Sequence, residues 1–115
     1  MYDRKFLQGT LDVLVLKTLS WGPMHGYGVA SWLEERTAAA LKIEEGSLYP
    51  ALHRMERKGW IESEWRLTEN DRRAKFYRLT AEGRHQLEAD ASGWAAFADA
   101  VGKVLYGTEA PAWAS

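Results

Sequence analysis

Side chains that could do chemistry are few and scattered along this chain of 115 residues. The chain has no cysteine, and its three histidines, His25, His53 and His85, do not have the spacing of metal ligands. Residues 46–49 (Gly-Ser-Leu-Tyr) lack the second glycine of a nucleophile elbow, and no Gly-rich loop ends in Gly-Lys-Ser/Thr. We therefore expect a protein that is not an enzyme and that has neither a metal site nor a cofactor.

The basic and hydroxyl side chains are more informative, because several of them share one face of an expected helix. The pattern over 46–58 predicts a helix with Leu48, Leu52 and Met55 facing inward and Gly59 as its stop. Its other face carries the side-chain types that contact phosphates and base edges in a major groove. These residues are Ser47, Tyr49, Pro50, His53, Arg54 and Arg57. This face predicts binding to double-stranded DNA, although each arginine is also compatible with ordinary solvation, and Tyr49 with packing at the core edge.

More basic side chains fall in an expected β-hairpin. Residues 61–67 alternate apolar and polar side chains, residues 68–73 are turn-forming, and residues 75–79 alternate again. From the hairpin tip, basic side chains can reach an adjacent DNA backbone or minor groove. Three basic residues are expected there: Arg72, Arg73 and Lys75.

The elements that must position these groups are three helices followed by the hairpin. Periodicity predicts helices over about 10–19 and 26–37 before the one at 46–58, which must place Pro50 in its first turn because proline has no N–H. In the second helix Tyr27 falls on the inward stripe. His25 and Tyr27 also open that helix, where contact with phosphate and a capping or packing role both remain open. The order predicts a mainly α (α+β) fold, a winged helix-turn-helix with a two-stranded wing.

A net charge of −1 conceals an uneven charge distribution. Residues 41–78 carry nine basic and seven acidic side chains, whereas residues 79–115 carry two basic and five acidic ones. A locally basic face binds phosphate even on a nearly neutral protein. No apolar run approaches the ~20 residues of a membrane span, and the N-terminus lacks a secretory stretch. We therefore expect a cytoplasmic protein that does not bind membranes.

The last predicted element is a long helix over 80–106, with Thr80 as its N-cap. Its apolar positions repeat with the average period of a coiled-coil seam. They are Leu87, Ala91, Trp94, Ala98, Val101 and Leu105. We expect this helix to form a homodimer, the alternative being that it folds back on the first three helices. Two copies of Trp94, each with Phe97 beside it, would line a slot for a flat aromatic effector or simply pack together.

The chain is thus expected to have three parts. Residues 1–79 form a winged helix-turn-helix DNA-binding domain, and residues 80–106 form the dimerisation helix. Residues 107–115, which contain Gly107 and Pro111, form a flexible tail.

Four blocks of sequence occur in a fixed order: Leu-Gln-Gly-Thr-Leu at 7–11, Gly-Pro-Met-His-Gly-Tyr-Gly at 22–28, Gly-Ser-Leu-Tyr-Pro-Ala-Leu-His-Arg-Met-Glu at 46–56 and Tyr-Arg-Leu-Thr-Ala-Glu-Gly at 77–83. Together they resemble the PadR family of bacterial transcriptional regulators, in its smaller subgroup with a single C-terminal helix. The resemblance covers about residues 7–106, and the block at 46–56 is its most specific part.

This resemblance implies an N-terminal winged helix, a homodimer formed through the C-terminal helix, and repression by operator binding. It also implies that the third helix carries certain side chains into the major groove: Ser47, Tyr49, Pro50 and His53 or Arg54. Some PadR relatives respond to phenolic or flat hydrophobic compounds. Glu44 and Glu45, just before the third helix, depart from this pattern. A helix start that binds phosphate favours neutral or basic residues, whereas the charge of these two glutamates repels phosphate.

The expected function is therefore that of a homodimeric repressor on a palindromic operator, with its recognition helices about one DNA turn (~34 Å) apart. Affinity is expected to come mainly from contacts to phosphates by Arg54, Arg57, Arg72, Arg73 and Lys75. One alternative function is a winged helix that binds another protein and no specific DNA. A second alternative makes small-molecule sensing the main activity, with Trp94 as the stacking platform.

Overall fold

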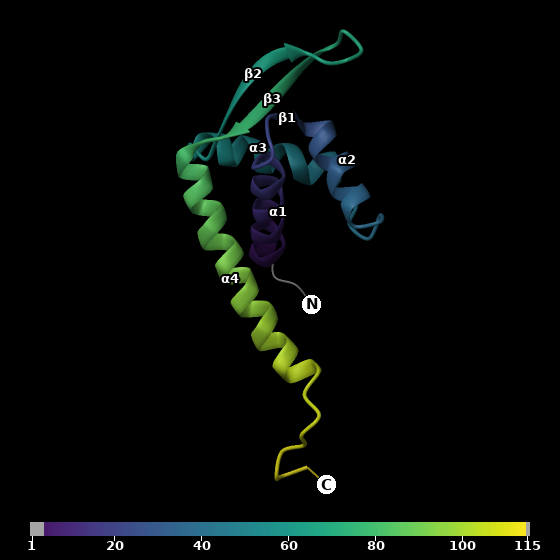
Figure 1. Cartoon of the computed structure of the whole chain (residues 1–115), viewed down its shortest axis with the longest axis vertical. Coiled ribbons are helices and arrows are strands. Elements are labelled where there is room, and N and C mark those ends of the chain that lie inside the picture. The colour runs from purple at the N-terminus through teal and green to yellow at the C-terminus, as the bar shows by residue number, and fades with distance from the viewer. Residues whose placement is uncertain (1–3, 115) are drawn as a thin grey trace.

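The computed structural model describes residues 4–114 and contains a winged helix from which a long C-terminal helix extends (Figure 1). Four helices and three short strands follow one another along the chain: α1 (Arg4–Leu19), β1 (Met24–His25), α2 (Gly26–Arg36), α3 (Glu45–Arg57), β2 (Ile61–Leu67), β3 (Arg73–Leu79) and α4 (Ala81–Leu105). This order confirms the mainly helical winged helix-turn-helix that the sequence predicts. The division into a 1–79 domain, a dimerisation helix and a flexible tail stays a prediction, and residues 1–3 and 115 lie outside the described part.

The sheet has three strands rather than the expected two. β1 pairs antiparallel with β3, which in turn pairs antiparallel with β2, so that the strand order is β1-β3-β2. The added strand consists of Met24 and His25, opposite Tyr77 and Phe76. A two-residue strand is too short to show an alternating pattern, which is why the sequence gives no sign of it.

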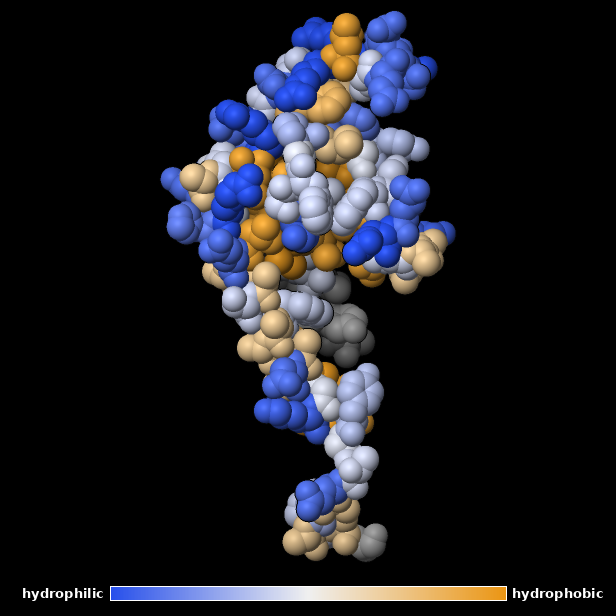
Figure 2. Space-filling view, in the orientation of Figure 1, coloured by the Kyte–Doolittle hydropathy of each residue, from blue (hydrophilic) through white to orange (hydrophobic). Residues whose placement is uncertain are grey.

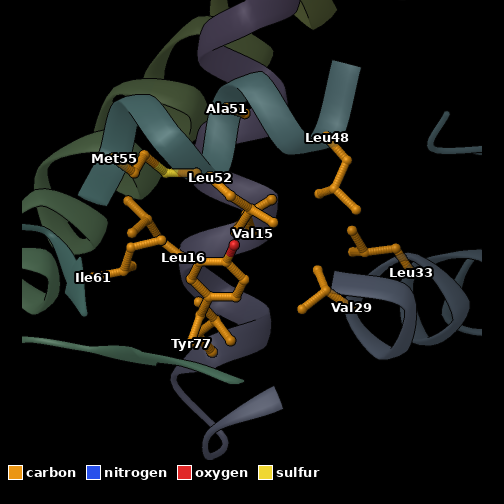
Figure 3. Close-up of a cluster of buried hydrophobic side chains, with 11 residues drawn as sticks. Val15, Leu16, Val29, Leu33, Leu48, Ala51, Leu52, Met55, Ile61 and Tyr77 are labelled. Carbon is orange, nitrogen blue, oxygen red and sulfur yellow. The ribbon is translucent and has the colours of Figure 1, made fainter. Parts of the chain in front are cut away.

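The core lies where α1, α2, α3 and the base of the sheet meet (Figure 3). The inward stripe predicted for α3 is confirmed, because Leu48, Leu52 and Met55 are at most 1% exposed. Other buried side chains, from three helices and two strands, complete the cluster: Val15, Leu16, Leu19, Val29, Leu33, Ala51, Ile61 and Tyr77. This packing holds α3 with one face fixed inward and the opposite face open.

Two predicted details of the helices are wrong. Tyr27 is 71% exposed, because α2 presents Gly26, Val29 and Leu33 to the core and Tyr27 lies about 100° from that stripe. α3 begins at Glu45, which puts Pro50 in its second turn rather than its first. Pro50 cannot donate the helical hydrogen bond to the Gly46 carbonyl, and the exposed position of Gly46 allows water to take that place.

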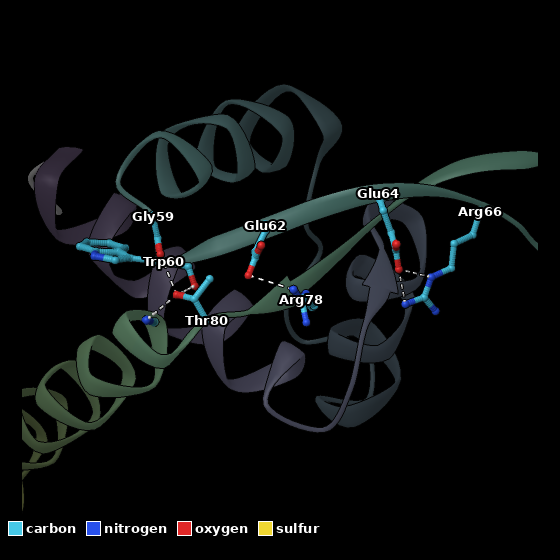
Figure 4. A network of polar contacts seen from close by, with 8 residues as sticks. Gly59, Trp60, Glu62, Glu64, Arg66, Arg78 and Thr80 are labelled. Carbon is cyan, nitrogen blue, oxygen red and sulfur yellow. Dashed lines mark hydrogen bonds and ion pairs between the residues drawn. The ribbon is translucent and has the colours of Figure 1, made fainter.

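α4 begins at a tightly built junction with the loop before β2 (Figure 4). Thr80 is the N-cap, as predicted, and its hydroxyl accepts a hydrogen bond from the Gly83 N–H at 3.0 Å. The Thr80 N–H also donates to the Trp60 carbonyl at 3.0 Å. From this fixed start the helix runs past the N-terminal end of α1, and the segment after it continues in the same direction (Figure 1). The molecule is therefore 65 Å long, against 29 and 23 Å in the other directions.

The surface differs between the two ends of the molecule. Figure 2 shows mostly hydrophilic residues over the end that carries the wing, with paler and apolar residues along part of α4. Within residues 4–114, no helix combines the length and the apolar composition needed to cross a bilayer.

Candidate nucleic-acid interface

A groove with a volume of about 500 Å³ lies between the start of α2, the exposed face of α3 and the wing. Six of the eleven residues predicted to bind DNA line it: His25, Tyr27, Tyr49, His53, Arg73 and Lys75. They come from three elements that are separate in the sequence, and the core packing brings them together. Burial raises the pKa of Tyr77, a nearly buried residue among those that line this groove, above its usual value of 10.

The exposed face of α3 carries most of the other predicted residues. Ser47, Pro50, His53 and Arg57 are all exposed, because they lie opposite the buried stripe of the helix. The N-cap position, Glu44, makes no side-chain capping hydrogen bond. The carboxylates of Glu44 and Glu45 are exposed at the helix start, where their charge repels phosphate.

Tyr49 joins α3 to α2 at the edge of the groove. It is 36% exposed, and a methyl group added at Gly26 would come within 2.9 Å of its ring. Glycine at position 26 is thus what allows α2 and α3 to approach this closely. Tyr49 packs at the core edge and still presents part of its ring to the groove.

His25 has a capping role at the start of α2. Its Nδ1 accepts a hydrogen bond from the Gly28 N–H at 3.0 Å, so this nitrogen carries no proton in this arrangement and Nε2 holds the N–H. The ring also lies edge-to-face against Phe76, with centroids 5.1 Å apart. The capping and packing interpretation of His25 is therefore confirmed, whereas contact with phosphate stays a prediction for His25 and Tyr27.

Arg54 does not lie on the open face where it was expected. Its guanidinium turns toward α1 and forms an ion pair of 2.5 Å with the Asp12 carboxylate, leaving the two side chains 21% and 11% exposed. Burial raises the pKa of Asp12 above its usual value of 3.8, and the attraction of Arg54 offsets part of that rise. In this structure Arg54 ties α3 to α1.

Lys75 also differs from its expected place. It is the third residue of β3 rather than part of the wing tip, and its Nζ lies 3.3 Å from Oε1 of Glu56 on α3. The Ser63 hydroxyl donates to Oε2 of the same carboxylate at 2.5 Å. This hydrogen bond, together with the charge of Lys75, holds the pKa of Glu56 below its usual 4.5. Glu56 thus fixes the wing to α3.

The wing tip keeps two of its predicted cations. Arg72 lies in the loop before β3 and Arg73 at its first position, and both side chains are exposed. The Arg73 guanidinium lies over the Trp65 ring, 5.2 Å from its centroid. Trp65 pairs with Lys75 across the strands, so Arg73 is its diagonal neighbour. The sequence reasoning missed Trp65 as a platform for Arg73, although the hairpin register could have indicated it.

A second hollow, of about 490 Å³, lies between α1 and α4; we call it the α1–α4 cleft. Asp12, Trp60, Trp94 and Phe97 are among its lining residues, and the rings of Trp94 and Phe97 have centroids 5.9 Å apart. Two acidic side chains, Asp12 and Asp90, are the charged groups among the described residues that line it.

The predicted seam of α4 is covered only near its start. Leu87 packs against the core, whereas Ala91 and Ala98 are exposed. The larger apolar members of the seam and their neighbour also keep substantial exposure: Trp94 44%, Phe97 47%, Val101 36% and Leu105 65%. Within one chain, α4 therefore lies alongside α1 as far as Trp94 and Phe97, and its last part, from Val101 to Leu105, extends beyond it. The role of this helix in a dimer stays a prediction.

Metal chemistry receives no support from the part of the chain that the structure describes. There, no group of three or more histidine, aspartate or glutamate side chains gathers in a way that could hold a metal ion.

A helix-turn-helix whose open polar face adjoins a wing with basic residues defines the winged-helix class of DNA-binding proteins. The model of the transcriptional regulator PadR-like family matches residues 15–89. The chain therefore belongs to the PadR family, as its resemblance indicates, and is a transcriptional regulator rather than an enzyme.

Individual relatives agree with this assignment. A transcriptional regulator of Mycobacterium tuberculosis is 32% identical over 88 residues, which cover 76% of this chain and 78% of that protein. The structure of a PadR family transcriptional regulator from Eggerthella lenta is similar with a TM-score of 0.75 and 34% identity, over 91% of this chain and 88% of that one. A transcriptional regulator from Clostridium thermocellum gives a TM-score of 0.79 and 26% identity, over 91% and 99% of the two chains.

Proposed function

We propose that this protein is a homodimeric repressor that binds a palindromic operator in double-stranded DNA in the cytoplasm. The observation that carries this proposal is the groove in which the open face of α3 meets the wing, since it gathers aromatic, imidazole and basic side chains from three elements. α3 would enter the major groove and the wing would follow the adjacent backbone. Nine residues would then contact DNA: His25, Tyr27, Ser47, Tyr49, Pro50, His53, Arg57, Arg72 and Arg73. Lys75 lies beside them in the groove but is held by Glu56.

The dimer would form through α4. The seam from Ala91 to Leu105 leaves apolar side chains exposed, and a second copy of the same helix would cover them through a two-fold axis. Two-fold symmetry would place two copies of α3 against two half-sites, which explains why the operator is expected to be a palindrome with half-sites about 34 Å apart.

The α1–α4 cleft would be the place for an effector. Its aromatic side chains, Trp60, Trp94 and Phe97, suit a flat aromatic molecule. Quenching of tryptophan fluorescence by a panel of aromatic compounds, compared between wild type and Trp94→Phe, tests this proposal. Compounds that quench both proteins equally, or neither, would argue that these rings only pack.

The alternative of a protein-binding winged helix requires an apolar open face on α3. That face instead carries Ser47, His53 and Arg57 beside the pyrrolidine ring of Pro50. The polarity of this face favours DNA over an apolar protein surface.

The decisive experiment is selection from a pool of random double-stranded DNA, followed by sequencing, at about 50 and about 200 mM salt. We expect a palindromic motif whose recovery falls steeply at the higher salt. A folded dimer that enriches no sequence would contradict operator binding and would leave protein binding as the function to test.

A further inference from the structure

Two arginines one turn apart on α3 have different surroundings. Arg57 is exposed and makes no ion pair with any side chain that the structure describes. Arg54 is 21% exposed and holds the carboxylate of Asp12, a residue of α1 that is 42 positions earlier in the sequence. Arg57 is therefore available to a DNA phosphate, whereas Arg54 must first leave its carboxylate.

Asp12 lies between α3 and the α1–α4 cleft. It accepts the hydrogen bond from Arg54, and it also lines the cleft together with Asp90 and Gln86 of α4. Among the described side chains that line the cleft, the two charged ones, Asp12 and Asp90, are both acidic. Asp90 and Lys58 also influence the Asp12 carboxylate electrostatically. A positive charge introduced into the cleft would therefore be attracted to the same carboxylate that Arg54 now holds.

We propose that Asp12 is a positioning residue that restrains Arg54 and thereby links the α1–α4 cleft to DNA affinity. In the free protein the ion pair keeps Arg54 away from the phosphates. A cation in the cleft that takes over the Asp12 carboxylate releases Arg54, which then adds one phosphate contact per protomer. This inference rests on the proposed function, because it assumes that α3 faces DNA.

The salt dependence of DNA binding measures this contact directly. The slope of log K against log salt changes by about 0.9 for each phosphate that a basic side chain neutralises. The probe is the duplex recovered by the selection experiment, and the proteins are wild type, Asp12→Asn, Arg54→Gln and the double variant. We expect Asp12→Asn to steepen the slope by about 0.9 per protomer. Arg54→Gln and the double variant should both match wild type.

Failure of this inference is distinguishable from failure of the proposed function, in which wild type itself does not bind duplex DNA. A folded Asp12→Asn protein with the wild-type slope would overturn the inference. A slope flatter than wild type in Arg54→Gln would overturn it too, because Arg54 would then contact phosphate despite Asp12. If Asp12→Asn does not fold, the salt slopes of Arg54→Gln and of the cleft variants described below still test the inference.

The link to the cleft is tested without a ligand by placing a charge there. Ala89 of α4 is exposed and lines the cleft, and Ala89→Gln is a neutral control of similar length for Ala89→Lys. We expect Ala89→Lys to steepen the salt slope by about 0.9 per protomer and Ala89→Gln to leave it unchanged. Adding Arg54→Gln to Ala89→Lys should restore the wild-type slope. A slope that stays steep without Arg54 would show that the new lysine acts by itself and would overturn the link.

Discussion

Replacement of Gly83 by alanine should destabilise the junction from which α4 begins. The site is buried in the first turn of α4, and an added methyl group would lie 2.0 Å from the Trp60 carbonyl oxygen and 2.7 Å from Cδ1 of Leu79. The first distance is roughly 1 Å or more below the 3.4 Å at which ordinary van der Waals contact begins. The obstacle is backbone, so α4 has to move away from the loop that holds Trp60.

The expected cost follows from what such a movement disrupts. Overpacking of a well-filled site costs about 1–3 kcal/mol. A shift of the helix by about 1 Å also breaks the 3.0 Å hydrogen bond from the Thr80 N–H to Trp60, with a net loss of about 1 kcal/mol. The free energy of unfolding should therefore fall by about 2–4 kcal/mol. At roughly 4 °C per kcal/mol for a chain of this size, the unfolding midpoint falls by about 8–16 °C.

Thermal unfolding followed by far-UV circular dichroism measures this shift, at one fixed protein concentration because a dimer unfolds in a concentration-dependent way. Gly46→Ala is the matched control, since position 46 is exposed and an added methyl group there meets nothing within 4 Å. Its midpoint should stay the same or rise, because alanine favours helix over glycine. A Gly83→Ala midpoint within about 2 °C of wild type would refute the reasoning, because α4 would then not depend on the close approach to Trp60.

Three further predictions concern the wing and the dimer. The lowered pKa of Glu56 stabilises the fold above pH 4.5, and this stabilisation is lost as the pH falls through the lowered value. The difference in unfolding midpoint between wild type and Glu56→Gln should therefore be largest near neutral pH and shrink below pH 4.5; a difference independent of pH would contradict it. Trp94→Ala should weaken the dimer in sedimentation through lost apolar burial, and an unchanged dissociation constant would place Trp94 outside the seam. Arg73→Ala should weaken binding to all duplexes and flatten the salt slope by about 0.9 per protomer, whereas an unchanged slope would exclude a phosphate contact.

The features that could be predicted from the sequence are those that local periodicity determines. The bounds of α4 were predicted to within one residue, because Thr80 is a strong N-cap and the apolar repeat is long. The buried face of α3 was also predicted correctly. Leu48, Leu52 and Met55 follow the helical period, and the other faces of the helix carry no second apolar stripe that could compete with them. In both cases the signal lies within a few turns of one element.

The features that could not be predicted depend on partners distant in the sequence. Arg54 shares the helical face of DNA-contacting residues by its spacing, yet its guanidinium is long enough to reach Asp12 on α1. Lys75 looks like a free wing cation until the fold places Glu56 beside it. Nothing in the pattern around either basic residue identifies which carboxylate it will meet, because only the packing of α3 against α1 and against the sheet decides that.

These pairings also determine how a protein with a net charge of −1 can bind a polyanion. Arg54 and Lys75 hold internal carboxylates, whereas Arg57, Arg72 and Arg73 make no ion pair with the described side chains. With three available cations in each protomer, the salt slope of a dimer should be about −5, against about −9 if all five contacted phosphate. A slope of about −9 would mean that DNA phosphates replace Asp12 and Glu56 as the partners of Arg54 and Lys75. The two internal ion pairs would then break on binding.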